Sequence, residues 1–146
     1  MDLGIRGRKA LVCASSQGLG YACAQALAEE GCEVWLNARN EARLLQAADR
    51  LRQASGAVVH SVVADLDTEG GRRVLLAACR EPDILINNNA GPPPGALDDW
   101  DHAAWLKALE SNLLAGALLL RAVIPGMRAR RFGRIVNITS GAVKAP

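Results

Sequence analysis

Residues 10–31 read ALVCASSQGLGYACAQALAEEG, and this stretch decides the fold class. It begins as a short apolar run, breaks into a loop with two glycines, and continues as an Ala- and Leu-rich segment. This order predicts a buried strand, a turn and a helix. Gly18 and Gly20 would let the loop backbone approach a large group, toward which the helix start directs free N–H groups. A pyrophosphate suits such a site, although a tight strand-to-helix turn needs glycine for steric reasons as well.

The remainder of the chain repeats this alternation of short apolar runs and longer helical segments. We expect strands at residues 9–14, 33–38, 58–64, 84–87 and 134–138, and helices at residues 18–30, 41–55, 68–80 and 101–129. Runs such as VWL and ILI lack polar alternation, which is typical of a parallel sheet covered on both faces. Right-handed crossovers then predict an α/β doubly wound (Rossmann) sheet in strand order 3-2-1-4-5, ending after the fifth strand. Candidate helix caps are Asn40 and one of Asp98, Asp99 and Asp101.

The size and composition of the chain fit one folded domain, residues 1–146. Half of the residues are hydrophobic and 22% are charged, which excludes the composition of a disordered chain. A net charge of +2 is too small to predict a nucleic-acid or membrane partner. The four cysteines include no CxxC pair, so we expect reduced thiols in a cytoplasmic protein and no metal site. The longest apolar run, residues 113–120, is far shorter than the roughly 20 residues of a membrane span.

Residues 13–20, CASSQGLG, resemble the phosphate loop TGxxxGxG of the short-chain dehydrogenase/reductase family. Gly18 and Gly20 match the last two glycines, whereas Cys13 and Ala14 replace the threonine and the first glycine. Two serine hydroxyls in the loop are further donors for phosphate or ribose oxygens. The candidate cofactor-binding residues of the loop are Ser15, Ser16, Gly18, Leu19 and Gly20.

Two further segments resemble cofactor-binding parts of the same family. Asp65 and Leu66, which follow the third strand, are similar to the residues near the adenine ring. The segment DILINNNAG resembles the family's NNAG segment. An ungapped alignment, which we favour, pairs Asn87 and Asn88 with the two asparagines, whereas a literal match shifts the pair by one residue. The cofactor-binding residues implied there are Asn88, Asn89 and Ala90.

Two later segments, ESNLLAG and GRIVNITSGAV, resemble the parts of the family that bear catalytic residues, which nominates Asn112 and Ser140. In the family the asparagine anchors a water in the proton relay, and the serine hydroxyl steadies the substrate oxygen. The family's tyrosine and lysine would follow Ser140, but the chain stops at Pro146. Tyr21 lies in the first helix and Lys144 is too close to Ser140. We therefore expect a truncated chain without the family's catalytic Tyr and Lys.

The end of the second strand indicates which nicotinamide cofactor is used. A carboxylate there accepts hydrogen bonds from a ribose 2′-hydroxyl, whereas a guanidinium pairs with a 2′-phosphate. Residues 36–40 read LNARN, with no carboxylate and with Arg39 in place to pair with the phosphate. This pattern favours NADP over NAD, although an exposed arginine before a helix cap would give the same letters.

The resemblance implies an NADP-dependent oxidoreductase that transfers a hydride between the cofactor and a carbonyl or alcohol, with a 3-oxoacyl thioester as one candidate substrate. It also implies a homo-oligomer, either a dimer or a tetramer. One alternative is a catalytically incomplete NADP-binding protein without turnover. A second alternative is an S-adenosylmethionine-dependent methyltransferase, whose usual acidic residue at the end of the second strand is absent here.

Overall fold

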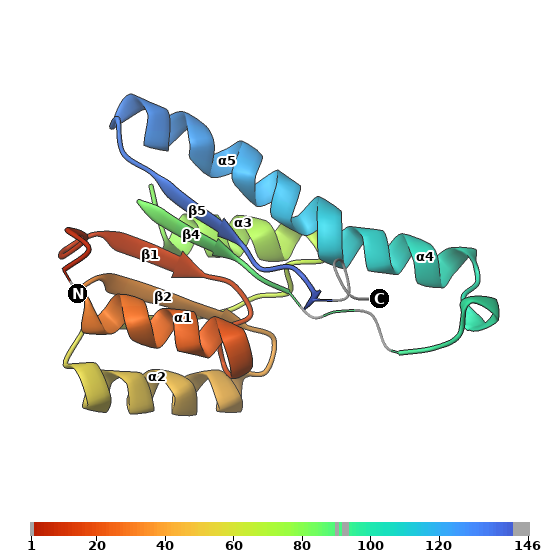
Figure 1. Ribbon diagram of the computed structural model, residues 1–146, viewed down its shortest axis with the longest axis horizontal. Helices are drawn as coiled ribbons and strands as arrows, with labels where there is room; N and C mark the ends of the chain where they lie inside the picture. The colour runs from red at the N-terminus through yellow and green to blue at the C-terminus, as the bar shows by residue number, and fades with distance from the viewer. Residues whose placement is uncertain (1, 90, 92–93, 142–146) are drawn as a thin grey trace.

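The computed structural model describes residues 2–89, 91 and 94–141, and its centre is a five-stranded sheet. The strands are β1 (Lys9–Val12), β2 (Glu33–Ala38), β3 (Val59–Val63), β4 (Ile84–Asn87) and β5 (Arg134–Asn137). Every neighbouring pair is parallel, and the order is β3-β2-β1-β4-β5 (Figure 1). The predicted fold class and strand order are confirmed.

The strands are connected by helices. They are α1 (Gly18–Glu29), α2 (Glu41–Ser55), α3 (Glu69–Ala78), η1 (Leu97–Asp99), α4 (His102–Leu109), η2 (Glu110–Leu114) and α5 (Ala115–Ala129). Figure 1 shows α1 and α2 on one face, with α3 and α5 on the other. Strands β1, β2 and β4 are therefore largely buried between helices, as their apolar runs predict, whereas all four residues of the edge strand β5 are exposed.

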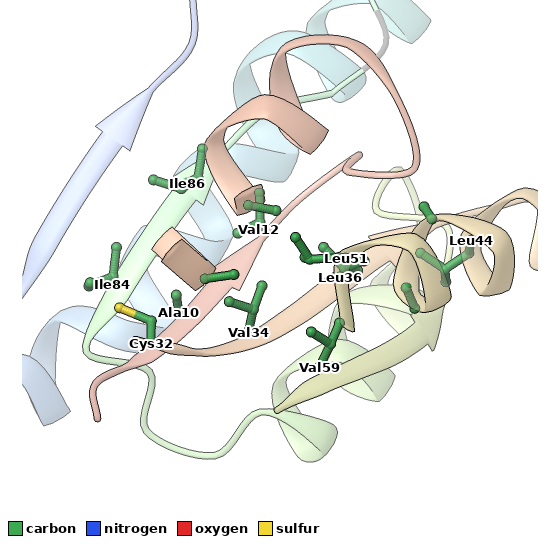
Figure 2. Packing of buried hydrophobic residues seen from close by; sticks show 14 of the residues in the cluster. Ala10, Val12, Cys32, Val34, Leu36, Leu44, Leu51, Val59, Ile84 and Ile86 are labelled. Carbon is green, nitrogen blue, oxygen red and sulfur yellow. The ribbon is translucent and has the colours of Figure 1, made fainter. Parts of the chain in front are cut away.

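The two cores arise because successive residues of a strand point to opposite faces. Ala10 and Val12 of β1 pack into the core under α1 and α2, part of which is drawn in Figure 2. Leu11 and the adjacent Cys13 pack into the other core, with residues of α3 and α5. Leu44 of α2 is fully buried in the first core, and burial of one such side chain contributes about 1.5–3 kcal/mol.

Two predicted helix caps are confirmed by hydrogen bonds. The Asn40 side chain accepts from the Arg43 N–H at 2.9 Å, which begins α2. The Asp101 side chain accepts from the Ala104 N–H at 2.8 Å, which begins α4. Each cap satisfies a backbone donor that the first turn of the helix leaves free.

The single helix expected at residues 101–129 is interrupted by the π turn η2. The Ala115 N–H reaches back five residues to the Glu110 carbonyl, which widens the helix locally. The Asn112 side chain donates to the Ala108 carbonyl at 2.9 Å. The sequence did not reveal this turn, because the spacing of apolar residues continues through it. The hydrogen bond of the Asn112 side chain to a backbone carbonyl also leaves no periodic pattern in the sequence.

The outer side of α4 and α5 is apolar and faces solvent. Its exposed side chains are Trp105, Leu106, Leu109, Leu113, Leu114 and Leu118. Within His102–Ala129 a window of 18 residues has a mean hydropathy of 1.4, so by length and composition alone the segment could cross a membrane. The α5 part of the segment packs against the sheet through buried residues such as Leu119 and Val123. In α4 and η2 no residue is buried, so within this segment only α5 covers the sheet.

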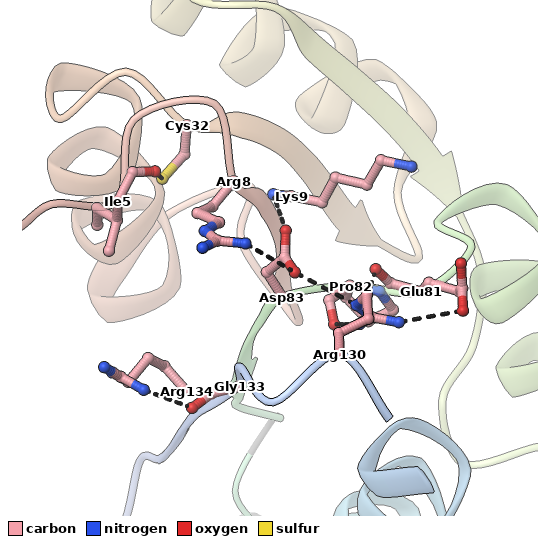
Figure 3. Close-up of polar contacts among 10 residues, drawn as sticks. All are labelled: Ile5, Arg8, Lys9, Cys32, Glu81, Pro82, Asp83, Arg130, Gly133 and Arg134. Carbon is pink, nitrogen blue, oxygen red and sulfur yellow. Dashed lines mark hydrogen bonds and ion pairs between the residues drawn. The ribbon is translucent and has the colours of Figure 1, made fainter. Parts of the chain in front are cut away.

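Asp83 joins the amino-terminal edge of the sheet to the end of α5 (Figure 3). Its carboxylate accepts a hydrogen bond from the Lys9 N–H at 3.1 Å and lies 3.5 Å from the Arg130 guanidinium and 3.7 Å from that of Arg8. Arg130 also donates to the Pro82 carbonyl at 2.9 Å. This charged cluster lies where the strands begin, so it stabilises the edge opposite the candidate site.

Candidate functional site

The candidate site is a cleft of about 360 Å³ at the carboxyl edge of the sheet. The β1–α1 loop, the end of β2 and the segments after β3 and β4 contribute its walls. The residues that line it are Ala14, Ser16, Gln17, Gly18, Asn37, Ala38, Arg39, Asn40, Arg43, Ala64, Leu66, Asn88 and Asn89. Parallel strands that end together in this way gather loops from distant parts of the sequence at one place.

The loop at residues 13–20, called the glycine loop below, brings the start of α1 close to β1. A Cβ on Gly20 would collide with the Ala14 carbonyl and would lie 3.0 Å from the Asn88 amide nitrogen. Gly18 has a φ of 61°, a conformation that L side chains rarely adopt. Among the described residues, Gln17 at the N-cap makes no side-chain hydrogen bond to α1. The first N–H groups of the helix and its positive dipole end are therefore directed at the cleft and available to an anion.

Ala14 has a φ of 46° at the position where the resembling family has a glycine. This left-handed conformation costs an L residue roughly 1–2 kcal/mol. Two contacts hold it in place: the Asn88 side chain donates to the Ala14 carbonyl at 3.2 Å, and the Ala14 N–H donates to the Asn37 side chain at 3.4 Å. The turn keeps a shape suited to glycine although its residue is alanine.

Ser15 has a different role from the cofactor contact that the sequence predicts. Its hydroxyl donates to the Val12 carbonyl at 2.8 Å and accepts from the Asn37 N–H at 3.0 Å. The residue is fully buried, so its side chain is not available to a ligand. Ser16, in contrast, lines the cleft, and Leu19 is 66% exposed in the first turn of α1.

Asn37 is a site residue that sequence reasoning missed. Its side-chain nitrogen donates to the Val62 and Ala64 carbonyls, both at 3.1 Å, and the residue is 1% exposed. It therefore links the end of β2 to the end of β3 beside the glycine loop. The signal that could have found it is an amide inside the apolar run VWLNA, since buried polar groups require partners.

Two guanidinium groups line the cleft where β2 ends. Arg39 follows the strand, and Arg43 lies one helical turn further, in the first turn of α2. The sequence predicted Arg39 but missed Arg43, for which the available signal is a second arginine in the first turn of the helix that follows Arg39. Two cations on one wall form an electrostatic environment that favours a phosphate.

The turn after β3 holds Asp65 and Leu66. The Asp65 carboxylate accepts from the Asp67 N–H at 3.1 Å, and Leu66 is 4% exposed in the wall of the cleft. A Cβ on Gly71 of α3 would collide with the Asp65 backbone, so the turn packs directly on that helix. The Thr68 hydroxyl caps α3 by accepting from the Gly71 N–H at 3.0 Å.

The three consecutive asparagines after β4 make separate contacts. Asn87 donates to the Asn137 side chain of β5 at 3.0 Å, whereas Asn88 bonds to the glycine loop. Asn89 bonds to the Asp67 side chain at 2.9 Å. The predicted cofactor-binding Ala90 lies outside the described residues.

The two predicted catalytic residues come from different elements that meet beyond the cleft. Asn112, in η2, and Thr139, after β5, line the same pocket of about 270 Å³. Ser140 follows Thr139 and is exposed. The structure thus brings Asn112 and the segment that carries Ser140 to one place, although 27 residues separate them in the sequence.

Two buried cysteines, Cys13 beside the loop and Cys79 after α3, are not reactive thiols. Burial raises the pKa of Cys13 to about 12, although the Asn88 backbone N–H, by its hydrogen bond to the sulfur, acts in the opposite direction. Burial also raises the pKa of Cys79 to about 12. Both thiols stay protonated at neutral pH. Among residues 2–89, 91 and 94–141, no group of three His, Cys, Asp or Glu side chains could hold a metal ion.

Ligands of doubly wound sheets bind in the crevice where the strand order reverses, which here lies between β1 and β4 at the glycine loop. Fold and site together define an α/β dinucleotide-binding protein. The family model described as short chain dehydrogenase matches residues 8–146, so the chain belongs to the short-chain dehydrogenase family of NAD(P)-dependent oxidoreductases. The methyltransferase alternative finds no support in this match.

Relatives of known sequence agree with this assignment. The chain is 37% identical over 147 residues to "Uncharacterized oxidoreductase YvaG" of Bacillus subtilis, covering 100% of this chain and 56% of that protein. It is 33% identical to human "Dehydrogenase/reductase SDR family member 4", covering 97% of this chain and 52% of that protein. The chain spans about half the length of the curated relatives it matches.

Solved structures give the same result. L-sorbose reductase from Gluconobacter frateurii, in complex with NADPH and L-sorbose, superposes with a TM-score of 0.94 at 33% identity, covering 100% of this chain and 57% of that one. A 3-oxoacyl (acyl-carrier-protein) reductase from Agrobacterium tumefaciens with NADP bound gives a TM-score of 0.85 at 31% identity, covering 94% of this chain and 54% of that one.

Proposed function

We propose that the chain is the cofactor-binding part of an NADP-dependent oxidoreductase acting on a carbonyl or alcohol. The observation that carries this proposal is the cleft that the open start of α1 shares with Arg39 and Arg43. The helix start favours the diphosphate of a dinucleotide, and the two cations favour a 2′-phosphate. Structural neighbours with bound NADPH and NADP support the same cofactor.

The roles of the individual residues follow from their positions. The backbone of Gly18, Leu19 and Gly20, with Ser16, holds the diphosphate and the adjacent ribose. Leu66 contacts the adenine ring, with Asp65 beside it. These contacts are the ones that the cleft's shape and charge favour.

Asn88, Asn89 and Ala90 complete the cofactor-binding set after β4. Asn88 and Asn89 line the cleft. Asn88 also holds the Ala14 carbonyl, so it supports the glycine loop from the opposite side. We propose that this segment lies along the ribose next to the nicotinamide.

When bound, the nicotinamide supplies the hydride chemistry, and the chain's own residues supply binding, orientation and proton handling. In this proposal Ser140 hydrogen-bonds the substrate oxygen and stabilises the charge that develops there. Asn112 holds a water in a proton path. We propose that the substrate oxygen and this water lie in the pocket that Asn112 and Thr139 line.

The substrate class is a carbonyl compound. The two candidates within it are a 3-oxoacyl thioester, as in the name of the Agrobacterium reductase, and a ketose, as in the L-sorbose complex. A panel containing one compound of each kind separates them by NADPH oxidation.

A second candidate function is NADP binding without turnover. For residues 1–146 taken alone, the observation that favours it is the place of Tyr21, whose ring lies 5.1 Å from the Arg50 guanidinium between α1 and α2. That position is outside the residues that line the pocket of Asn112, so Tyr21 is not placed to act as the proton donor.

Binding and turnover distinguish the two candidates. A fluorescence titration of the full-length protein is expected to give NADPH an affinity about tenfold or more above that of NADH, because a 2′-phosphate gains charge-assisted hydrogen bonds. NADPH oxidation with any carbonyl of the panel then establishes the reductase. Tight NADPH binding with no oxidation in the whole panel leaves the second candidate, and absence of NADPH binding overturns both.

We also propose a cytoplasmic homo-oligomer. Cys13, Cys23, Cys32 and Cys79 are all free thiols, which is typical of a reducing compartment. The exposed apolar side of α4 and α5 favours contact with a second copy, because exposed patches of this kind mark association surfaces.

A further inference from the structure

The carboxylate of Asp67 connects two segments that lie far apart in the sequence. Its Oδ1 accepts from the Asn89 side chain at 2.9 Å, and its Oδ2 accepts from the Ser111 hydroxyl at 2.7 Å. Asn89 closes the triangle by also donating to the Ser111 carbonyl at 2.9 Å. A hydroxyl-to-carboxylate bond of this length is a charge-assisted one, stronger than a bond between neutral groups. Three segments, after β3, after β4 and in η2, are thus tied at one point.

A second link joins the segment after β3 to the π turn, at Glu110, the residue before Ser111. Arg72 of α3 donates to the Glu110 carboxylate at 3.0 Å and to the Leu66 carbonyl at 2.7 Å. The Arg72 side chain is 12% exposed, so this ion pair is less screened by water than a surface pair. Glu110 and Ser111, the two residues that precede Asn112, are therefore held by α3 and by the segment between β3 and α3, respectively.

The π turn needs such support because its own packing does not fix it. Of the described residues Glu110–Leu114, none is buried. A π turn also has poorer geometry than the α-helix on either side and occurs mainly as single turns at functional sites. Hydrophobic burial therefore does not favour the π turn over a regular helix here. Polar side-chain contacts must supply that preference.

We propose that Asp67 is a positioning residue that fixes the π turn carrying Asn112 by hydrogen-bonding Asn89 and Ser111 at once. This inference rests on the proposed function for the role of Asn112, and it deepens that function by naming what holds the residue in place. Asp67 hydrogen-bonds Ser111, the residue before Asn112, so it acts on Asn112 through the backbone of η2. The same turn contains Asp65 and Leu66, so one short segment serves both the adenine side and the catalytic side of the site.

Two substitutions separate the hydrogen bonds of Asp67 from its charge. Asp67→Ala removes both acceptors. Asp67→Asn keeps an acceptor for Asn89, and its amide nitrogen can donate to the Ser111 hydroxyl, which then acts as acceptor. Glu69→Ala is the matched control, because it removes a carboxylate two residues away whose side chain is 80% exposed.

The test measures amide hydrogen exchange along the unliganded chain and the NMR resonance of the Asn112 side-chain amide. Loss of the hydrogen bonds in Asp67→Ala is expected to speed exchange in η2 by about tenfold or more and to shift the Asn112 resonance. Asp67→Asn is expected to restore both, and Glu69→Ala to change exchange by no more than about twofold. Exchange in α2 should stay unchanged, because the effect is local.

Three results would overturn the proposal. The first is an exchange rate in η2 of Asp67→Ala equal to that of the wild type, and the second is an equal increase of the exchange rate in α2. The third is that Asp67→Asn and Asp67→Ala increase the exchange rate in η2 equally. In the full-length enzyme, Asp67→Ala is further expected to lower kcat by about tenfold or more while the affinity for NADPH changes by about twofold at most. Failure of the proposed function has a different signature. Wild-type protein would then bind no NADPH, while the exchange measurements would still decide the role of Asp67.

Discussion

Ser15 and Asn37 hold each other through a reciprocal pair of hydrogen bonds. The Ser15 hydroxyl accepts from the Asn37 N–H at 3.0 Å, and the Ser15 N–H donates to the Asn37 carbonyl at 2.8 Å. Both residues are buried, so the pair joins the glycine loop to β2 out of reach of water. The loop's shape therefore depends on a strand that is remote in sequence.

Ser15→Ala should destabilise the protein by about 1–3 kcal/mol, because it leaves the buried Asn37 N–H without an acceptor. Urea denaturation measures this loss directly. Ser16→Ala is the matched control, since Ser16 is partly exposed in the cleft, and it should change stability by about 0.5 kcal/mol at most. Equal stability of the two variants would contradict the buried role of Ser15.

Ala14→Gly should stabilise the protein by about 0.5–1 kcal/mol. Glycine relieves the left-handed strain of roughly 1–2 kcal/mol at Ala14 but loses part of this gain through the greater freedom of the unfolded chain. The measurement is again the free energy of unfolding in urea.

The control for Ala14→Gly is Ala24→Gly in α1, where the residue is buried and helical. That change should destabilise the protein by about 1 kcal/mol, because glycine weakens a helix interior. A destabilising Ala14→Gly would show that the turn gains nothing from glycine at this position.

Gly20→Ala should destabilise the protein by about 1–3 kcal/mol and weaken NADPH binding, because the new methyl group would push the start of α1 away from the Ala14 carbonyl. Thermal unfolding and a fluorescence titration measure the two effects. In α3, Gly70→Ala is the comparison, since a Cβ there meets nothing within 4 Å, and its stability should be unchanged or slightly higher. Wild-type behaviour of Gly20→Ala would exclude close packing as the reason for this glycine.

The strand order and helix positions were predictable because they follow from local apolar runs, turn residues and the handedness of crossovers. The caps at Asn40 and Asp101 followed from the same local rules. Long-range pairing is different. Ser15 was expected to face a ligand because its chain neighbours form the phosphate loop, and only the position of Asn37 shows that its hydroxyl is used internally.

The catalytic residues could be nominated only through resemblance. Asn112 and Ser140 carry no local pattern that marks them as partners, because a lone asparagine or serine is common on any surface. The π turn that presents Asn112 depends on Asp67, 45 residues earlier in the chain, and no spacing rule connects the two. Arg43 could have been predicted, because it lies in the first turn of the helix that follows Arg39, and both residues line the cleft.

Leu106→Glu combined with Leu113→Glu should reduce self-association. Leu106 is 54% exposed and Leu113 is 58% exposed on the outer side of α4 and η2, where a second copy would have to bury the introduced charges. Sedimentation velocity across a range of protein concentrations measures the change. Leu45→Glu is the control, since Leu45 is 46% exposed on α2, away from that side. A wild-type protein that stays monomeric at every concentration would contradict the proposed oligomer.

Arg39→Glu should reverse the cofactor preference. A carboxylate at the end of β2 repels a 2′-phosphate and can accept hydrogen bonds from a 2′-hydroxyl, so NADPH affinity should fall by about a hundredfold while NADH affinity stays equal or rises. Arg43→Ala should weaken NADPH alone, by about tenfold, because it removes one of two cations from the cleft. Arg73→Ala, in an exposed pair with Glu69 on α3, is the control and should change neither affinity. Equal losses of NADPH and NADH in Arg39→Glu would show that the arginine supports the fold of the cleft and does not read the phosphate.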